Sequence, residues 1–500
     1  MRVDDATDAA ARGARGFWGE TAFAACAHAA IALLGGRVFR PAFDDEIYTL
    51  DLLEKVTGAL ALLKAFASAY DVHPPLSYLA FYLLHVSGAG EAGLRALSLA
   101  MSMGAVAIAH RLLLRLDVSG QGYAGVSSAE RLIALLFLAT TPLLVSQGDA
   151  IRWYPMYGLV FMATLYFHVR ERAAGRAAIV SSAAAGVLVS VNFLGVFVYP
   201  LLTADRILSG RFRWRREIGQ GALCLAFALP GLVTLAGGLQ GAPTDYMASQ
   251  FAGSRPVAAA AITAIGFLGG HSLGIVQSIA LVPLGAFAAF VLARGLRDRQ
   301  TRVLAFQFAA LVAMVALGFA KPRSFAYLAL VLSVLFAHHF LARRAARTAL
   351  AAVALVTAFG ALANLRGNDT PFKRNTAVPF EEIRAFVAAN TGADDVVILS
   401  DPVAYWNLRN FGPACVSLYL LNGDCAPGAA RRLVLVEGHS APGEPREAYL
   451  AARGALIAKR REVARAYFGV DEEFALKRRM QPELGRFVLE GTIYGSADTD

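Results

Sequence analysis

The chain carries little charge for its length. Only 17% of its 500 residues are Asp, Glu, Lys or Arg, whereas a soluble globular domain carries about 25%. Hydrophobic residues make up 57% of the chain, and the mean hydropathy is +0.51. The sequence also lacks an internal repeat, a zinc-ligand spacing, a P-loop, a GxSxG motif and a GxGxxG motif between a strand and a helix. These absences argue against the common soluble enzyme classes, and the composition favours an integral membrane protein.

Apolar runs predict a multi-span α-helical membrane protein with about eleven transmembrane helices, some of them shortened by polar residues. Residues 1–18 mix Arg and Asp and lead to no clear cleavage site, so we expect a cytoplasmic N-terminus (1–20) and a retained first span. The run 76–87 is only about twelve residues long, and we expect it to lie at the membrane interface. The expected spans are 21–38, 92–115, 131–147, 153–169, 177–191, 193–208, 218–238, 273–293, 302–320, 325–341 and 347–363.

The distribution of positive charge predicts the orientation of this transmembrane region, residues 21–363. We count the Lys and Arg residues of this region and of the N-terminus on the assumption that 76–87 does not cross the membrane. Then 21 of them fall on one side of the membrane and 9 on the other. Short cytoplasmic loops carry the positive excess, so the basic side is expected to be cytoplasmic. The first outer loop (39–91) and residues 364–500 then lie outside the cytoplasm. The membrane itself is expected to be the inner (plasma) membrane. The basic loops are 111–131, 170–176, 206–216, 294–302 and 343–347.

Residues 364–500 are nearly neutral, with 17 Lys and Arg against 18 Asp and Glu. We expect a small extracytoplasmic α/β domain with a helix from Pro379 to about Asn390, and we interpret 446–467 as helical and basic. Buried strands are expected at 396–399 and 433–436. Two of the four cysteines, Cys415 and Cys425, lie here. Outside the cytoplasm they can form a disulfide, and otherwise they are two thiols, so this point stays open.

An acidic cluster, Asp44-Asp45-Glu46, follows the first expected span directly. Carboxylates beside a membrane are costly and often functional. One of them can serve as a general base that takes a proton from a hydroxyl group. The alternative is a solvated loop in which Asp44 or Asp45 caps a helix over about 46–66. The cluster can also bind a divalent metal, but no second acidic cluster completes such a site, so we expect no metal and no other cofactor.

The expected outer side carries two further turns with cations. In the first turn Asp149, Arg152 and Tyr154 stand close together, and Arg152 either binds a phosphate or pairs with an acid such as Asp149. In the second, Lys321 and Arg323 are basic on the side where positive charge is scarce, which favours a lipid-linked phosphate over a chance arrangement.

Two histidines on the same side complete the candidates. His73 precedes Pro74 and Pro75, which restrict the backbone where the first outer loop returns. His271 stands at the start of the expected span 273–293 and is the weaker candidate, since a lone histidine there is more often structural.

Taken together, these residues resemble a known family. Asp45-Glu46 with Tyr48, then His73-Pro74-Pro75-Leu76-Ser77-Tyr78, then Gly90-Glu91 with Arg95 resemble the GT-C superfamily of membrane glycosyltransferases. The protein O-mannosyltransferase and aminoarabinose transferase branch is the most similar, and the resemblance covers about residues 20–345. Arg152 and Tyr154 also resemble that branch, and so does the stretch from Lys321 to Phe325, although Phe325 stands where the branch has a tyrosine.

The resemblance implies transfer of a sugar from a polyprenyl-phosphate carrier to a hydroxyl acceptor on a lipid, glycan or protein, usually with inversion. In that reading Asp45, or Asp44 as the near alternative, is the base, and Glu46 orients a partner. Arg152, Lys321 and Arg323 hold the phosphate, with Tyr48, His73, Asp149, Tyr154 and His271 as further substrate contacts.

Two other functions fit the composition. A transporter or lipid flippase is expected to carry ionisable residues at mid-membrane and a repeat that relates two halves, and neither is evident in the sequence. A non-catalytic protein of the same fold is the other alternative. Membrane lipids are expected partners and nucleic acids are not, because the basic residues follow the pattern of cytoplasmic loops.

Overall fold

The structure is a computed structural model that divides into two compact units. The first comprises Met1–Phe39 with Leu52–Gly367, and the second comprises Arg40–Asp51 with Asn368–Asp500. The structure describes residues 17–34, 44–67, 73–116, 125–175, 177–241, 288–316, 327–341, 351, 380–400, 402–410, 412–418, 425–427, 429–437, 444–458, 460–469 and 488–496.

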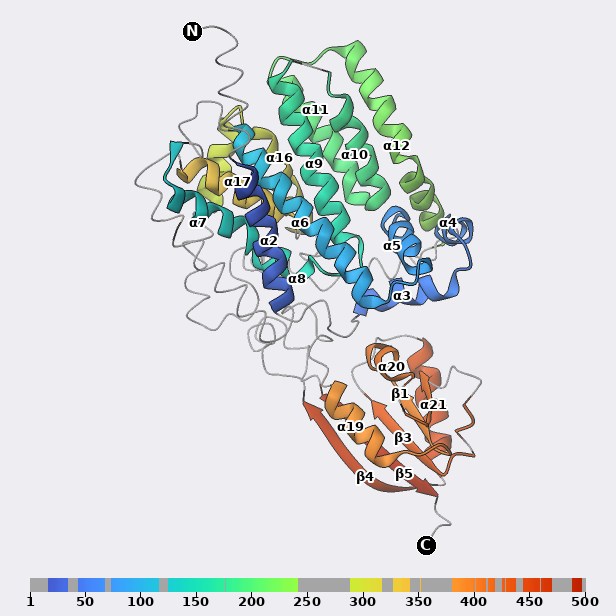
Figure 1. The fold of residues 1–500 in the computed structure, drawn as a ribbon. Coiled ribbons are helices and arrows are strands. Elements are labelled where there is room, and N and C mark those ends of the chain that lie inside the picture. Colours follow the sequence, from blue (N-terminus) through green and yellow to red (C-terminus); the bar gives the residue numbers. More distant parts are fainter. Residues whose placement is uncertain are drawn as a thin grey trace. The chain divides into compact units, whose positions relative to one another are not determined.

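The first unit is a bundle of helices (Figure 1). Its core is formed by apolar side chains from most of these helices, with Trp153, Tyr157, Phe161 and Tyr327 among the largest fully buried residues. Its labelled helices are α2 (Trp18–Leu34), α4 (Ala59–Ala67), α5 (Leu76–Val86), α6 (Glu91–Leu116), α7 (Ser128–Ala139), α8 (Pro142–Gln147), α9 (Trp153–Ala173), α10 (Ile179–Val191), α11 (Val198–Leu208), α12 (Trp214–Gly241), α16 (Arg302–Ala316) and α17 (Leu328–Leu341), and residues 288–297 are also helical.

Helices α2 and α6 are antiparallel neighbours. Thr21 Oγ1 lies 2.8 Å from His110 Nδ1, and His28 Nε2 lies 2.7 Å from Ser102 Oγ. The chain therefore leaves α2 and enters α6 at the same end of the bundle. Helix α5 is eleven residues long, which corresponds to about 16 Å and is too short to cross a membrane of about 30 Å.

Two described helical stretches, Glu91–Leu116 and Trp214–Ala236, are long and apolar enough to cross a membrane by themselves. Trp18–Leu34, Leu76–Val86, Ile179–Val191 and Leu328–Leu341 are shorter apolar helices. The number of eleven crossings stays a prediction. Of the expected spans, 347–363 lies outside the described residues apart from helical residue 351, and 273–293 does so apart from the helical residues from 288 onward.

Two expected helices are each divided. The span 131–147 is not continuous: α7 ends at Ala139 and α8 begins at Pro142, because proline lacks the N–H that a continuing helix needs. The helix expected over about 46–66 forms two helices, α3 (Asp44–Lys55) and α4, with Gly58 in the break. By contrast, the boundary between the expected spans 177–191 and 193–208 is present at Asn192. The Asn192 side chain accepts a hydrogen bond from Leu194 N at 3.0 Å and starts a 3-10 turn, η3 (Phe193–Phe197).

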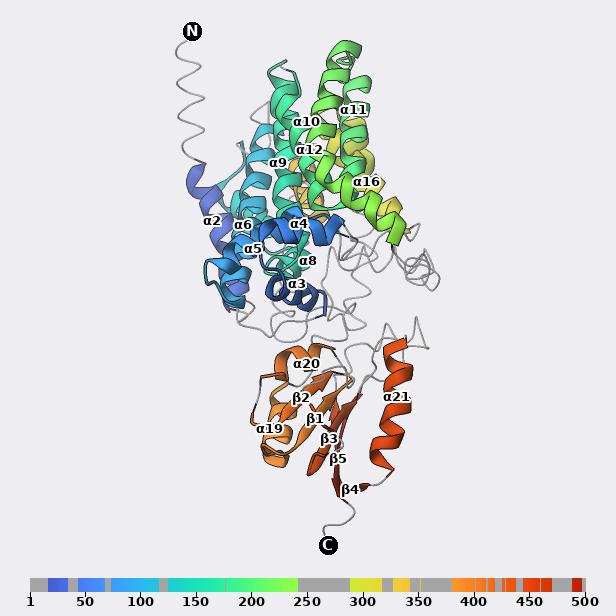
Figure 2. The same cartoon turned by 90° about the vertical axis from the view of Figure 1, so that its right-hand side faces the viewer.

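Small residues allow α10 and α12 to approach closely, and the two helices lie side by side in Figures 1 and 2. A methyl group on Gly186 would overlap the carbonyl of Cys224 and come within 2.8 Å of Phe227 Cβ. Ser190 Oγ donates a hydrogen bond to the Phe227 carbonyl at 2.8 Å. This combination of small residues and a polar contact is the packing that replaces hydrophobic association between membrane helices.

Charged residues gather where α9 ends. The Asp205 carboxylate is fully buried and lies 2.9 Å from His168 Nε2, 3.0 Å from Arg172 Nη1 and 3.4 Å from Arg302 Nε. Arg172 also donates to the Gln300 carbonyl at 2.7 Å. Arg211 donates to the Arg172 carbonyl, and Arg299 donates to the Ser209 carbonyl at 2.7 Å. The described parts of the basic loops 170–176, 206–216 and 294–302 therefore meet at one end of the bundle. A buried carboxylate needs such partners, because an unpaired one costs several kcal/mol.

The second unit contains a five-stranded sheet with strand order β2-β1-β3-β5-β4. The first three of these strands are parallel, and β5 is antiparallel to both β3 and β4. Helices α19 and α21 cover opposite faces (Figure 2). The elements are β1 (Val396–Leu399), β2 (Cys415–Leu418), β3 (Arg432–Glu437), β4 (Arg460–Gly469), β5 (Val488–Ser496), α19 (Phe380–Asn390), α20 (Pro402–Leu408) and α21 (Glu444–Ile457).

The expected α/β character of this region is present, including strands at 396–399 and 433–436. The helix expected over 446–467 is wrong in its second half. Helix α21 ends at Ile457, and the chain continues as β4. Cross-strand partners decide this outcome: Arg465 lies 2.9 Å from Glu490 on β5 and forms an ion pair with Glu462 on its own strand. Such pairs stabilise a sheet but are invisible to helical periodicity.

Cys415 and Cys425 form a disulfide, with their Cα atoms 5.7 Å apart, whereas Cys26 and Cys224 are free. We predict that the chain, denatured after thiol–disulfide exchange has been quenched at lysis, reacts with two equivalents of N-ethylmaleimide without reductant. After reduction it reacts with four. Only thiolates are nucleophilic, so the two sulfurs of a disulfide do not react. Mass spectrometry of the intact chain counts the adducts. A Cys415→Ser variant serves as the control and takes up three equivalents without reductant. Four adducts on the unreduced wild-type chain would contradict the bridge.

Candidate active site

Arg152 is the residue that directly precedes α9. Its backbone is extended (φ −146°, ψ 175°), and its N–H donates to the Ala150 carbonyl at 2.7 Å, so the chain turns sharply before the helix begins. The Arg152 residue is only 5% exposed. A guanidinium cannot lose its proton in a protein, so the interior must accommodate a permanent positive charge at this point.

A phenol and an imidazole contact this guanidinium. Arg152 Nη1 donates a hydrogen bond to Tyr78 Oη at 2.7 Å, and Arg152 Nη2 lies 3.4 Å from His73 Nδ1. The guanidinium carbon also lies 5.6 Å from the centre of the Tyr78 ring, within the range of a cation–π interaction. The His73 ring stacks on Trp153, with 5.8 Å between the ring centres.

The prolines of the first outer loop position Tyr78. Pro74 and Pro75 are buried, and α5 begins at Leu76 directly after them. Proline fits the start of a helix because the first turn leaves its N–H groups without helical partners. Tyr78 therefore stands in the first turn of α5, where its ring packs 4.7 Å from Phe66 on α4 and its hydroxyl reaches Arg152.

One face of α6 carries buried polar side chains toward the turn that precedes Arg152. Arg95, Ser98 and Ser102 follow a helical spacing and are each at most 1% exposed. Ser98 Oγ donates to the Ala150 carbonyl at 2.7 Å. Asp149, in the same turn, is fully buried. An arginine and an aspartate are thus enclosed within a bundle of apolar helices, which is the usual mark of a functional region.

His28 on α2 holds this turn from the other side. Its Nδ1 lies 2.9 Å from the Ala139 carbonyl, just before α8, and its Nε2 lies 2.7 Å from Ser102 Oγ. A carbonyl only accepts, so we assign the proton to Nδ1 and leave Nε2 to accept from Ser102. A methyl group on Gly148 would come within 3.0 Å of His28 Nε2 and 2.7 Å of Ser102 Oγ. The turn therefore packs against His28 without space for a larger residue.

The electrostatics of this arrangement favour an anion. The N-terminus of α9 carries the positive end of the helix dipole. Arg152 adds a full positive charge at the same point, and His73 adds a ring nitrogen beside it. Like charges gathered at a helix N-terminus are stabilised when a carboxylate or phosphate approaches. The site is therefore suited to an acidic group, with aromatic side chains around it.

The structure brings together four of the residues expected from the sequence. Arg152, His73, Asp149 and Tyr154 lie at the start of α9 or contact it, and Tyr154 is buried with its ring 4.3 Å from that of Trp153. Of the α3 residues, Glu46 is buried and Tyr48 is 61% exposed, and both belong to the second unit. Asp44 and Asp45 begin α3, and their side chains lie outside the description, as do the residues Lys321, Arg323 and His271.

Sequence reasoning gave no role to His28 and used Arg95 only as part of a motif. A signal was present for both, because each is an ionisable residue inside an apolar run that was expected to span the membrane. The identity of their neighbours was not available in the sequence. Ser102 and Ala139 lie 74 and 111 residues from His28 along the chain.

Comparison with known proteins defines the class of fold. No family model and no curated protein matches the chain. A solved structure does match, and it shows that the chain shares the multi-helical fold of a membrane protein.

That structure is the aminoarabinose transferase ArnT from Cupriavidus metallidurans bound to undecaprenyl phosphate. The TM-score is 0.51 at 12% sequence identity, over 94% of this chain and 97% of ArnT. The resemblance expected from the motifs is therefore confirmed at the level of the fold.

We predict that Gly148→Ala lowers the free energy of unfolding by about 1–3 kcal/mol, since the added methyl group overpacks the turn. Adding Ser102→Ala removes the oxygen at 2.7 Å, so the double variant recovers part of the loss. Denaturant unfolding of the purified protein measures both effects. Gly219→Ala on α12 is the matched control, because nothing lies within 4 Å of its added methyl group. Equal stability of Gly148→Ala and wild type would contradict this packing.

Proposed function

We propose that the protein is a membrane glycosyltransferase that moves a sugar from a polyprenyl-phosphate donor to a hydroxyl acceptor. The observation that carries the proposal is the buried Arg152 at the start of α9, held by Tyr78 and His73. It occurs in a fold shared with ArnT, whose solved structure contains undecaprenyl phosphate.

The proposed role of Arg152 is to bind the phosphate of the lipid carrier. A guanidinium offers a fork of N–H donors that matches two phosphate oxygens, and burial strengthens the charge-assisted bonds. The start of α9 adds the positive end of its helix dipole at the same point. Lys321 and Arg323 supply further positive charge in this proposal, and Asp149 and Tyr154 orient the cationic groups. His271 and Tyr48 serve as sugar or acceptor contacts.

In the proposed reaction the acceptor oxygen attacks the anomeric carbon of the sugar from the face opposite the phosphate. A new C–O bond forms, and the bond from the anomeric carbon to the phosphate oxygen breaks with its electron pair going to the phosphate. The proton of the acceptor hydroxyl passes to the Asp45 carboxylate, with Asp44 as the alternative base and Glu46 orienting the pair. The sugar inverts. Arginine and lysine stabilise the phosphate charge, so the mechanism uses no metal cofactor.

The proposed location is an inner membrane, with residues 364–500 outside the cytoplasm. The Cys415–Cys425 bridge supports this orientation, because disulfides persist in oxidising compartments. The basic loops that meet at the C-terminal end of α9 support a cytoplasmic position for that end. The start of α9 and Arg152 would then lie toward the outer leaflet, where a lipid-linked sugar is available to an extracytoplasmic acceptor.

We predict that Asp45→Asn lowers sugar transfer by roughly 10²–10⁴-fold, the usual contribution of a general base, while expression and membrane insertion are unchanged. The assay follows release of free undecaprenyl phosphate from a panel of undecaprenyl-phosphate sugars in membranes that contain the protein. Asp44→Asn is the matched control and keeps most of the activity. The reverse pattern would move the base by one residue, and activity in both variants would overturn the assignment of a base to this cluster.

We predict that Arg152→Gln weakens binding of undecaprenyl phosphate by roughly ten- to 150-fold, as expected for loss of hydrogen bonds to a charged group. Arg152→Lys keeps the charge but not the fork and gives an intermediate affinity. Native mass spectrometry of the purified protein measures these affinities. Arg215→Gln removes the same charge from an exposed position and serves as the matched control. We expect Arg215→Gln and Asp45→Asn to bind undecaprenyl phosphate with wild-type affinity. Unchanged binding by Arg152→Gln would reject the phosphate role.

A further inference from the structure

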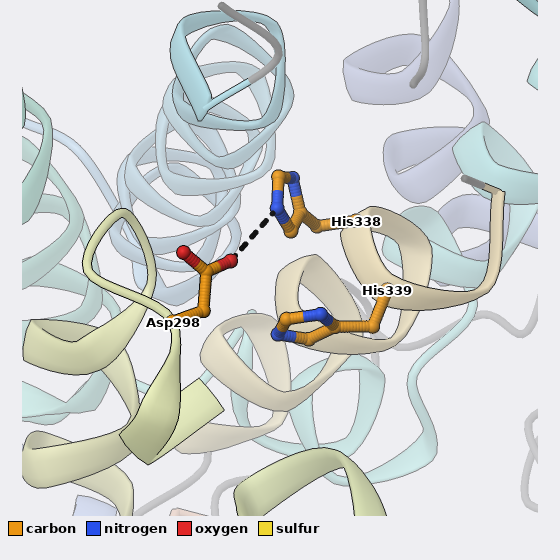
Figure 3. Close-up of side chains that lie close together, drawn as sticks. All are labelled: Asp298, His338 and His339. Atoms are coloured by element: carbon orange, nitrogen blue, oxygen red, sulfur yellow. Dashed lines mark ion pairs between the residues drawn. The ribbon is translucent and has the colours of Figure 1, made fainter. Parts of the chain in front are cut away.

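A second group of ionisable side chains lies apart from the candidate active site. Asp298, His338 and His339 each offer one ligand atom, and these three atoms lie within 4.8 Å of one another. Figure 3 shows the Asp298 carboxylate and the two imidazole rings turned toward one small region. All three side chains are partly exposed, so an ion from the solvent can reach them.

The separation within this cluster is larger than that of an ordinary hydrogen bond. His338 Nε2 lies 3.4 Å from Asp298 Oδ2, whereas N–H···O bonds in proteins are 2.7–3.2 Å long. His168 and Asp205, a similar pair in the same bundle, lie 2.9 Å apart. Two ligands that each lie about 2.1 Å from a tetrahedral zinc ion are about 3.4 Å apart. The geometry of Asp298 and His338 therefore fits two ligands of one ion.

Neighbouring polar groups orient two of the three ligands. The Gln300 backbone N–H donates to Asp298 Oδ1 at 2.8 Å, which leaves Oδ2 directed at the histidines. Thr301 Oγ1 is fully buried and lies 3.2 Å from His339 Nε2. Outer hydrogen bonds of this kind are a regular feature of metal sites, because they fix the direction of carboxylate and imidazole ligands.

We propose that Asp298, His338 and His339 bind one divalent transition-metal ion, with zinc as the best match. Two imidazoles and one carboxylate are a donor set that zinc accepts, and water completes the coordination. The ion connects the turn between residues 288–297 and α16 to the C-terminal end of α17. Its role is to fix three helical segments, 288–297, α16 and α17, to one another at this end of the bundle.

This metal site is independent of the proposed transferase chemistry. The N-terminus of α17 lies near the candidate active site, where Tyr327 packs 4.5 Å from Tyr157 on α9. His338 is eleven residues farther along the chain, about 17 Å at 1.5 Å per residue. The cluster lies instead beside the Asp205 group, since Arg172 contacts both Asp205 and Gln300. Failure of one proposal leaves the other intact.

The test uses the full-length protein without a histidine tag, in nanodiscs, stripped with a chelator and titrated with ZnCl₂ by calorimetry. We expect one saturable equivalent of zinc per chain. Asp298→Asn and His338→Gln each lower the affinity by roughly tenfold or more. His85→Gln on α5 is the matched control and binds as wild type does, because its imidazole is not one of the three ligand groups.

A second measurement reads the site without any variant. Co²⁺ added to the stripped wild-type protein should give the intense visible absorption of a tetrahedral ion with nitrogen and oxygen ligands, and zinc should abolish it by displacement. This result stands even if a variant fails to fold. Absence of saturable 1:1 binding, or equal affinity in wild type and both cluster variants, would overturn the proposal.

Discussion

The burial of one permanent charge sets the arrangement around the start of α9. A guanidinium removed from water costs several kcal/mol unless polar groups surround it, and Arg152 is 5% exposed. Tyr78 supplies a hydroxyl and an aromatic face, and His73 supplies a ring nitrogen. Two prolines place Tyr78 in the first turn of α5, while His28 and Ser102 hold the turn that leads to Arg152. These separate elements of the bundle thus converge on one cation.

The two ends of the bundle use charge differently. Where α9 ends, the Asp205 carboxylate is enclosed by His168, Arg172 and Arg302, an arrangement that ties α9 and α11 to the start of α16. Where α9 begins, the Arg152 cation stands at the positive end of the helix dipole, in the same turn as the buried Asp149. The first end is therefore built for cohesion between helices. The second is suited to receiving a negatively charged group, which is what the proposed phosphate carrier provides.

The sequence predicts the broad architecture and part of the site. Apolar runs located α6, α9, α10 and α17, and buried β-patterns located β1 and β3, because hydrophobic periodicity is a local property. Arg152 and His73 stood out as polar residues at the edge of apolar runs. Long-range contacts were beyond reach: pairing with β5 makes a strand of residues 460–469, and His28 joins Ala139 and Ser102 across 74 to 111 residues. Side-chain partners so distant leave no trace in local spacing.

The most direct test of the account is a structure of the full chain in nanodiscs with undecaprenyl phosphate bound. The account predicts a phosphate oxygen within about 2.7–2.9 Å of an Arg152 guanidinium nitrogen. A phosphate bound elsewhere, with Arg152 still donating to Tyr78 and remote from the lipid, would contradict the central claim.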